Sequence, residues 1–558
     1  MKKFTALISI LIFSVVVWAD ITVTPYGAAG IVSGSCFLIE AAPAKTAPAK
    51  ADSVETDSDA AASAVTVSAE ADANDTVSSV ASSDKDDSVA VMVDCGLFMR
   101  GDLEGSALDE KNEDIEPELV NARALVLTHA HTDHCGKIPL LIHKGFKGKI
   151  YCASATKDLA LALFKNRTGF ENIPRKWFWS QSQMFNAKRN KKPVVIHWTK
   201  NCKNSIKNVE ETSQDMSMAD AEKEAGINFY LCKNCSAWET ENAIAPFFAV
   251  VEYNSETEIA ADFKFRLINA GHIPGSASVV FTVQNKTIVF SGDLGNGFSR
   301  LTGIFDVPEK ADALFAEATY ADDKYKLDFK DYEIFRKDLL AALKKGNTVW
   351  IPALAFNRTQ KILYEINLMK REGLLDKKIP VYSVSPSANA INDLYQKESQ
   401  NKSGGWFLDE VYKTGSVLPK DLRQQMVREY DSQKIVISAS GDMDYGMSQQ
   451  LRNIYISKKD VSIMIVNYVG PGSTASNLLS GRFKSSQFKR RASIKKYDIF
   501  SDHPDFDILC KWLSNQEKSA KICIIHSSAQ NAAKMKKLLN KKGWKNIFTA
   551  SEKQKIII

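Results

Sequence analysis

One short segment of the chain concentrates side chains that bind divalent metal ions. The stretch THAHTDHCG places His129, His131, Asp133 and His134 within six positions. Neutral imidazoles and a carboxylate are ligands that zinc and similar ions accept, and this spacing in a tight loop lets one turn serve two adjacent ions. The whole chain has only eight histidines, so the cluster is an unlikely product of composition. We interpret it as part of a metal site.

Other polar residues follow apolar stretches much later in the chain. His272 in GHIPGSAS, Asp293 in FSGDLG, His503 in FSDHPD and His526 in IIHSS each come after a run that is typical of a buried strand. Residues at the carboxyl ends of strands in an open α/β sheet meet at one edge. We therefore expect these residues to gather with the His-rich loop, although they are far apart in sequence.

The elements that must hold this site are strands alternating with helices. Residues 21–40 predict a hairpin of two strands, and AVMVDCGLF predicts a strand ending before Asp94. A strand through Leu125–Leu127 leads into the His-rich loop, and KIPLLIHKGF has helical spacing. A further strand is expected in YDIF, residues 497–500, before His503. This alternation predicts an α/β fold.

The ordered set of residues resembles the metallo-β-lactamase superfamily. Asp94, the H-x-H-x-D-H run at 129–134, His272 and Asp293 look like its motifs one to four. Glu317 in EATYAD, His503 and His526 look like motifs A, B and C of the β-CASP branch, which includes the nuclease subunit of the mRNA 3′-end cleavage factor and its bacterial and archaeal relatives. The resemblance implies a metallo-β-lactamase αββα sandwich with an inserted α/β β-CASP cap domain.

The resemblance also implies a role for each residue in a site with two Zn²⁺ per chain. The first zinc ligands would be His129, His131 and His272, the second Asp133, His134 and His526, and Asp293 would bridge them. Asp94 would orient a ligand. Glu317, His503 and Asp133 would be catalytic.

The reaction that this resemblance implies is hydrolysis of RNA phosphodiester bonds. Two zinc ions lower the pKa of a shared water, so that a metal-bridging hydroxide attacks phosphorus. His503, paired with Glu317, would act as general acid toward the departing sugar oxygen. Two departures stand out: Ser527 and Ser528 replace the usual Gly and acid after motif C, and Asp502 stands where Ala is common. The second places a carboxylate that is expected to raise the pKa of His503.

The domain boundaries follow from the same reading. We expect a signal peptide at 1–19, the metallo-β-lactamase domain at 20–321 and 491–558, and the β-CASP domain at 322–490. Within the first part, residues 41–88 lack aromatic residues and any usable period, which predicts a disordered insertion.

A basic segment adjoins motif B. RFKSSQFKRRASIKK, from Arg482 to Lys496, holds seven Lys or Arg, two Phe and no acid, which suits a single-stranded nucleic acid. A solvated basic face is the alternative. The choice of RNA over single-stranded DNA rests on the resemblance alone. The predicted substrate-binding residues are Arg482, Lys484, Lys489, Arg490 and Arg491.

A second insertion, at about residues 190–245, contains cysteines. His197, Cys202, Cys232 and Cys235 supply four ligands, enough for an additional structural zinc site. A disulfide in an oxidising compartment explains Cys232 and Cys235 equally well.

The N-terminal segment bears on where the protein is located. Lys2 and Lys3 precede an apolar run and Val17-Trp18-Ala19, a pattern typical of a signal peptide, which predicts a secreted or periplasmic protein without a stable membrane span after cleavage. An N-terminal anchor or a cytoplasmic enzyme is the alternative.

The chain carries a net charge of +6 although residues 52–87 contain ten acids and one lysine, so the basic remainder suggests an anionic partner.

Other functions are left open by the sequence. A thioester or lactam hydrolase of the same fold would share the residues from His129 to Asp293, but would not need Glu317, His503 and His526 around an inserted domain. A nuclease that acts on DNA is a further alternative, which the predicted signal peptide disfavours. An RNA-binding scaffold without activity would have lost metal ligands, and none is missing here. A homodimer is also left open.

Overall fold

The structure is a computed structural model, and it describes most of the chain outside two long insertions. The described residues are 20–42, 88–99, 101–103, 105–166, 194–196, 229–231, 244–299, 302–320, 328–401, 433–444, 446–470, 472–483 and 489–558. The predicted signal segment, most of the low-complexity insertion, Lys484, and the proposed ligands His197, Cys202, Cys232 and Cys235 lie outside these residues.

Two seven-stranded sheets form the centre of the molecule. In the first, the order is β21-β1-β2-β3-β4-β5-β8. The predicted hairpin is confirmed, since β1 and β2 pair antiparallel with Ile21 opposite Ala41. The strands are β1 (Ile21–Pro25), β2 (Phe37–Ala41), β3 (Val89–Val93), β4 (Ala124–Val126), β5 (Lys149–Cys152), β8 (Phe248–Val250) and β21 (Ile556–Ile557).

The second sheet faces the first and has the order β20-β19-β13-β12-β11-β10-β9. Phe37 of the first sheet packs against Phe290 and Phe315 of the second, with ring centroids 5.4 and 6.2 Å apart. Burial of such aromatic rings between the sheets drives the two layers together. The strands are β9 (Thr257–Ala260), β10 (Phe263–Asn269), β11 (Ala277–Val283), β12 (Lys286–Phe290), β13 (Ala313–Glu317), β19 (Lys521–Ile525) and β20 (Ile547–Thr549).

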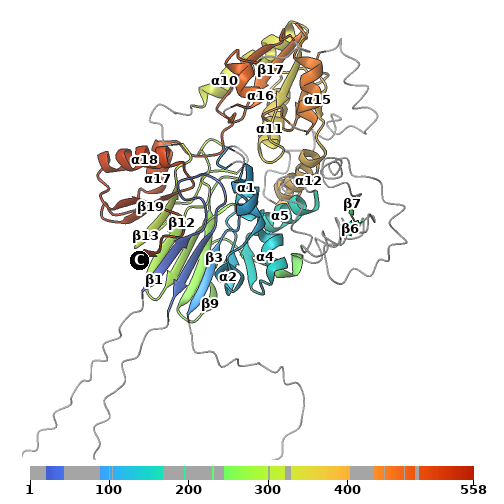
Figure 1. The fold of residues 1–558 in the computed structure, drawn as a ribbon. Coiled ribbons are helices and arrows are strands. Elements are labelled where there is room, and N and C mark those ends of the chain that lie inside the picture. Colours follow the sequence, from blue (N-terminus) through green and yellow to red (C-terminus); the bar gives the residue numbers. More distant parts are fainter. Residues whose placement is uncertain are drawn as a thin grey trace, which may run out of the picture.

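Helices cover the outer face of each sheet (Figure 1). Apolar residues of α2, α4 and α5 are buried in the same core as the first sheet, and those of α17 and α18 in the same core as the second. This arrangement is the predicted αββα sandwich. The helices are α1 (Gly105–Glu113), α2 (Pro117–Val120), α3 (Thr132–Cys135), α4 (Ile138–Lys144), α5 (Ser154–Asn166), the 3-10 turn Ala245–Phe247, α17 (Phe506–Trp512) and α18 (Ala529–Lys541).

The segment between β13 and α17 forms a separate cap domain. Its five-stranded sheet has the order β15-β16-β14-β17-β18, and every pair in it is parallel. The cap sits on the sandwich with α12 against α5 (Figure 1). Its elements are α10 (Lys330–Lys344), β14 (Thr348–Pro352), α11 (Arg358–Arg371), β15 (Val381–Ser383), α12 (Pro386–Asn401), β16 (Lys434–Ser438), α15 (Gly446–Tyr455), β17 (Val461–Ile465), α16 (Thr474–Leu479) and β18 (Ser493–Lys496).

One predicted strand is wrong. Residues 497–500 do not form a strand; the cap sheet ends with β18, and the chain then crosses to α17 as a loop. Tyr497 and Phe500 are buried because their rings pack edge-on against Phe335 of α10, at 5.3 and 4.8 Å. These two apolar side chains therefore hold the segment that connects the cap to the sandwich. A local sequence pattern does not distinguish burial of this kind from burial within a strand.

Two smaller observations complete the fold. Within the second insertion only β6 (Val194–Ile196) and β7 (Phe229–Leu231) are described, and they pair in parallel. Among the described residues, the helices are too short or too polar for any of them to traverse a bilayer.

Candidate active site

Three imidazoles and one carboxylate form a first group of potential metal ligands. One nitrogen or oxygen atom from each of His129, His131, His272 and Asp293 lies within 4.8 Å of all the others. The Nδ1 atom of His131 is 3.1 Å from Nε2 of His129 and 3.2 Å from Nε2 of His272. The loop after β4 supplies the first two, and the turn between β10 and β11 supplies His272.

A second group lies beside the first. Asp133, His134 and His526 likewise offer ligand atoms within 4.8 Å of one another. His526 follows β19 directly and adopts a positive φ of 48°, which turns its ring back toward the His-rich loop. Its Nε2 atom lies 3.4 Å from Oδ2 of Asp133.

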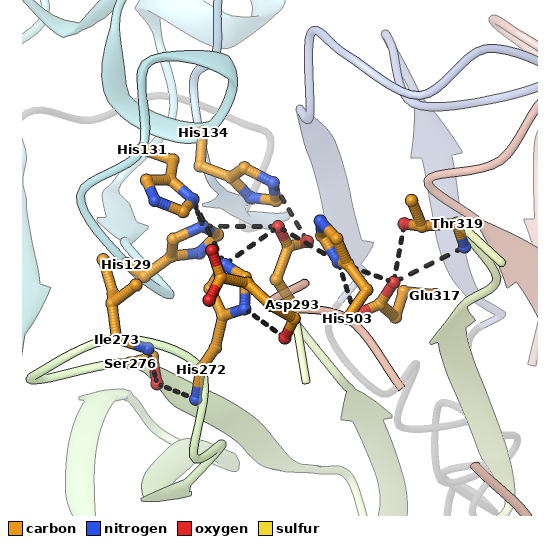
Figure 2. Close-up of polar contacts among 12 residues, drawn as sticks. His129, His131, His134, His272, Ile273, Ser276, Asp293, Glu317, Thr319 and His503 are labelled. Atoms are coloured by element: carbon orange, nitrogen blue, oxygen red, sulfur yellow. Dashed lines mark hydrogen bonds and ion pairs between the residues drawn. The ribbon is translucent and has the colours of Figure 1, made fainter. Parts of the chain in front are cut away.

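Asp293 lies between the two groups, with one carboxylate oxygen facing each. Its Oδ2 atom is 3.5 Å from Nε2 of both His129 and His272. Its Oδ1 atom is 3.2 Å from Nε2 of His134 and 3.5 Å from Nε2 of His526. Figure 2 shows this carboxylate at the centre of the converging imidazoles. A carboxylate in this position is suited to bridging two cations.

The donor set fits two divalent cations. Nε2 of His134 and Oδ1 of Asp293 are buried and have no hydrogen-bond partner among the described residues. Buried polar atoms without partners are costly, and a cation between these two would satisfy both. Burial and the neighbouring His129 lower the pKa of His131 to about 3, so its ring is neutral at pH 7, the state that binds metal.

The carboxylates leave negative charge for a cation to neutralise. Burial opposes protonation of His134 and His526, but the Asp293 carboxylate raises the pKa of both rings. The same imidazoles hold the pKa of Asp293 well below its usual range, against the effect of burial. The centre therefore attracts positive charge.

Asp94 fixes the orientation of His134. Its Oδ2 atom lies 2.6 Å from Nδ1 of that ring, which leaves Nε2 to face Asp293. The other oxygen accepts from the backbone N–H of Thr128 at 2.8 Å, and the Ser35 hydroxyl donates to Oδ2 at 3.0 Å. Asp94 thus holds His134 and belongs to neither group of potential metal ligands, and its role in a metal site stays a prediction.

Three further imidazoles, those of His129, His272 and His526, are held in the same manner through Nδ1. The Thr128 hydroxyl lies 3.0 Å from Nδ1 of His129, and the Thr319 hydroxyl lies 2.9 Å from Nδ1 of His526. His272 places its Nδ1 3.0 Å from the main-chain carbonyl of Asp502. Such partners set the tautomer that presents Nε2 to a metal.

The buried Glu317 pairs with the partly exposed His503 beside the ligand groups. Both carboxylate oxygens of Glu317 lie 3.1 Å from Nδ1 of His503, and Oδ2 of Asp293 lies 3.9 Å from that same nitrogen. Glu317 also accepts from the backbone N–H of Leu294 and from the Thr319 hydroxyl, both at 2.7 Å. Burial lowers the pKa of His503, but Glu317, together with Asp293 and Asp502, raises it to about 9.

Models of known families match three consecutive parts of the chain. They are described as the metallo-beta-lactamase superfamily (residues 80–352), the Beta-Casp domain (359–478) and the Zn-dependent metallo-hydrolase RNA specificity domain (488–549). The chain belongs to the β-CASP family of metallo-β-lactamase-fold ribonucleases. This membership confirms the predicted fold class and makes the chain a metal-dependent hydrolase.

Similar proteins come from bacteria and archaea. "Ribonuclease TTHA0252" of Thermus thermophilus is 24% identical over 81% of this chain and 91% of its own length. The "RNase J-like protein" of Methanocaldococcus jannaschii is 26% identical over 78% of this chain and 86% of its own. "Transcription termination factor FttA" of Methanothermobacter thermautotrophicus is 24% identical, and the match spans 78% of this chain and 63% of that protein.

The two departures from the β-CASP pattern have structural explanations. Ser528 is the N-cap of α18 and accepts from the N–H of Asn531 at 3.2 Å, while the Ser527 hydroxyl donates to the Ala318 carbonyl at 2.7 Å. The loop that carries His526 is therefore anchored without the usual acid. Asp502 adds to the raised pKa of His503, behind Glu317 and Asp293, but its carboxylate turns toward the cap.

Four of the predicted substrate-binding residues lie in the described part of the chain, and none of the four belongs to the groups of potential metal ligands. Arg482 donates from Nε to the Ser480 hydroxyl at 3.1 Å, and Arg490 donates to the Leu478 carbonyl at 3.4 Å. With the exposed Lys489 and Arg491 they flank the end of α16 and the edge strand β18 of the β-CASP sheet. Their role stays a prediction.

Sequence reasoning missed several residues that hold the site. Thr128 and Thr319 contact imidazoles, and Asn357, Arg358 and Lys361 of the cap contact Asp502. Thr128 and Thr319 lie next to singled-out motifs, so their position was a usable signal. The three cap residues lie about 140 positions before Asp502, and nothing local connects them to it.

Proposed function

We propose that the protein is a zinc-dependent endoribonuclease that hydrolyses phosphodiester bonds of single-stranded RNA. The observation that carries the proposal is the position of Asp293, whose two oxygens face two separate ligand groups beside the His503–Glu317 pair. A site for two cations next to a held, proton-bearing imidazole suits phosphodiester hydrolysis.

The residues that would hold the cations are those the sequence singled out. His129, His131 and His272 would hold one, Asp133, His134 and His526 the other, and Asp293 both. When bound, two zinc ions lower the pKa of water and neutralise charge on the phosphoryl oxygens. Asp133, about one-fifth exposed, would bind the second cation and could also accept a hydrogen bond from the water that attacks phosphorus.

His503 supplies the proton for the leaving group. Glu317 holds its Nδ1, so Nε2 is the nitrogen that remains to face the departing sugar oxygen. A pKa of about 9 keeps this ring protonated at neutral pH. General-acid catalysis of this kind contributes about 10²- to 10⁴-fold in rate. When O3′ is the departing oxygen, His503 protonates it to a 3′-hydroxyl, and the attacked phosphorus stays on the other fragment as a 5′-phosphate.

Three observations support RNA as the substrate. The family model over residues 488–549 is described as an RNA specificity domain, similar proteins carry ribonuclease names, and exposed Arg482, Lys489, Arg490 and Arg491 flank β18. Exposed cations attract the phosphate backbone of a single strand. The basic segment is thus the proposed substrate-binding surface.

The test uses end-labelled linear RNA, circular RNA and the matching single-stranded DNA, each with and without chelator. Cleavage of the circle identifies an endonuclease, and metal analysis of the purified protein identifies zinc. Asp293→Ala and His503→Ala should each abolish or greatly slow cleavage, whereas His143→Ala, which removes an exposed histidine of α4, should not. Cleavage that survives chelator and Asp293→Ala would refute the proposal, and hydrolysis of only lactams or thioesters would favour the other reaction classes.

Export is proposed from the N-terminal segment alone. If Lys2, Lys3 and the apolar run form a signal peptide, the mature protein begins near Asp20. Amino-terminal sequencing of protein recovered from the expressing cell and from its medium checks this. An intact Met1 on protein found only inside the cell would contradict it.

A further inference from the structure

Asp502 lies where the cap domain meets the first ligand group. It belongs to the loop between β18 and α17, the segment through which the chain returns from the cap to the sandwich. The residue is 6% exposed.

The carboxylate of Asp502 is bound by three residues at the start of α11 in the cap. Nδ2 of Asn357 donates to Oδ1 at 2.8 Å, and an Nη atom of Arg358 lies 3.2 Å from Oδ2. The Lys361 ammonium forms an ion pair with Oδ1. All three cap residues are at most 6% exposed. A buried carboxylate with two buried cations tolerates the loss of a partner poorly, because the remaining charges stay desolvated.

The main chain of the same residue reaches the metal-binding groups. The carbonyl oxygen of Asp502 lies 3.0 Å from Nδ1 of His272, the nitrogen opposite to the one that faces Asp293. Asn357 also approaches the His272 carbonyl, at 3.4 Å. The next residue in the chain is His503, whose ring packs 5.0 Å from that of His272. One residue therefore connects the cap to a ligand and to the proposed acid.

We propose that Asp502 is a positioning residue through which the cap holds His272 in its metal-binding orientation. Its side chain is fixed by Lys361, Arg358 and Asn357, and this fixes the main-chain carbonyl that selects the Nδ1–H tautomer of His272. Loosening the cap side of this chain of contacts weakens the first cation and leaves the second in place. The inference rests on the proposed metal binding, but not on the identity of the substrate.

The matched control is a second buried ion pair on the same helix. Four positions after Lys361, Glu365 of α11 pairs with Nε of Arg336 at 2.5 Å. Their side chains are 2% and 8% exposed. Arg336→Met and Lys361→Met each remove a cation and leave a buried carboxylate, so both should lower the melting temperature of the full-length protein. Only the second change touches the contacts that lead to His272.

The experiment loads each full-length variant with zinc and measures release of the two ions to a competing chelator. We expect Lys361→Met to weaken one ion by about 10- to 100-fold, the usual effect of removing an outer partner of a ligand, and to leave the other within about 2-fold. Arg336→Met should keep both ions at wild-type affinity. Asp502→Asn, which keeps the carbonyl but loses the charge, should resemble Lys361→Met, and the double variant should be no worse than either.

The outcomes separate this proposal from the proposed function. Wild-type zinc affinity in Lys361→Met, or equal zinc loss in Arg336→Met, would overturn the role of Asp502; if Asp502→Asn fails to fold, the two cap variants still decide. A wild-type chain that holds no zinc would overturn the metal site and this inference together. A chain that holds two ions, loses one in Lys361→Met and cleaves no RNA would refute only the RNA substrate.

Discussion

Replacing Asp94 by asparagine should weaken zinc binding without disturbing the backbone. Asp94 adopts a φ of +60°, a conformation that asparagine tolerates as well as aspartate and that alanine does not. The carboxylate accepts on both oxygens: Thr128 N–H donates to Oδ1 at 2.8 Å, and Nδ1 of His134 lies 2.6 Å from Oδ2. An asparagine has a single acceptor oxygen, so one of these two donors must face an NH₂ group.

The size of the effect follows from this conflict. If the amide nitrogen faces His134, the ring must move its proton from Nδ1 to Nε2, the atom that faces Asp293 and the cation. If it faces Thr128, a buried N–H loses its partner. Leaving a buried donor unsatisfied costs about 1 to 3 kcal/mol, which corresponds to roughly 5- to 150-fold weaker binding of one ion.

The assay is zinc release to a colorimetric chelator, with circular dichroism to confirm folding. Ser35→Ala is the graded control, because it removes one donor to Oδ2 at 3.0 Å and leaves the carboxylate and its contact with His134 intact. We expect the control to change zinc affinity by less than about 5-fold. Equal affinity in Asp94→Asn and wild type would refute the reasoning that Asp94 sets the tautomer of His134.

Three further predictions concern the acid, the metal loop and one helix. Glu317→Gln removes the main carboxylate that raises the pKa of His503 to about 9, so burial is opposed less and that pKa falls. Since the protonated ring is the active form, the alkaline limit of kcat/KM should move to lower pH, and an unmoved limit would contradict the acid role. Gly96→Ala places a Cβ 1.6 Å from the Asp133 carbonyl oxygen, so it should cost about 1 to 3 kcal/mol of stability and loosen zinc, and an unchanged melting temperature with normal zinc would be inconsistent with this packing. Ser528→Ala removes the N-cap of α18 and should cost about 1 kcal/mol in urea unfolding, whereas no loss would show that the cap contributes nothing.

The local sequence pattern predicted a strand or helix correctly where the apolar residues of that element alone determine it. The hairpin of β1 and β2, the strand–loop–helix around His129 and the strand before His526 follow from apolar runs and their spacing. The prediction of a strand at residues 497–500 was wrong, because Tyr497 and Phe500 are buried against Phe335 of α10 and not by strand pairing. An apolar run shows that a segment is buried, but it does not show which other segment covers it.

By itself, the sequence determined which kinds of side chain form the site. These are imidazoles and carboxylates at the ends of apolar strands, in an order and spacing that suit a metal centre. The tertiary structure decided which atoms face one another. Sheet register and the docking of the two domains bring Asp293 between both ligand groups and turn Asp502 toward Lys361. They also place Asp94, Thr128 and Thr319 where these residues set the imidazole tautomers. Those contacts join residues up to a little over 200 positions apart, and their geometry arises from packing that no local pattern contains.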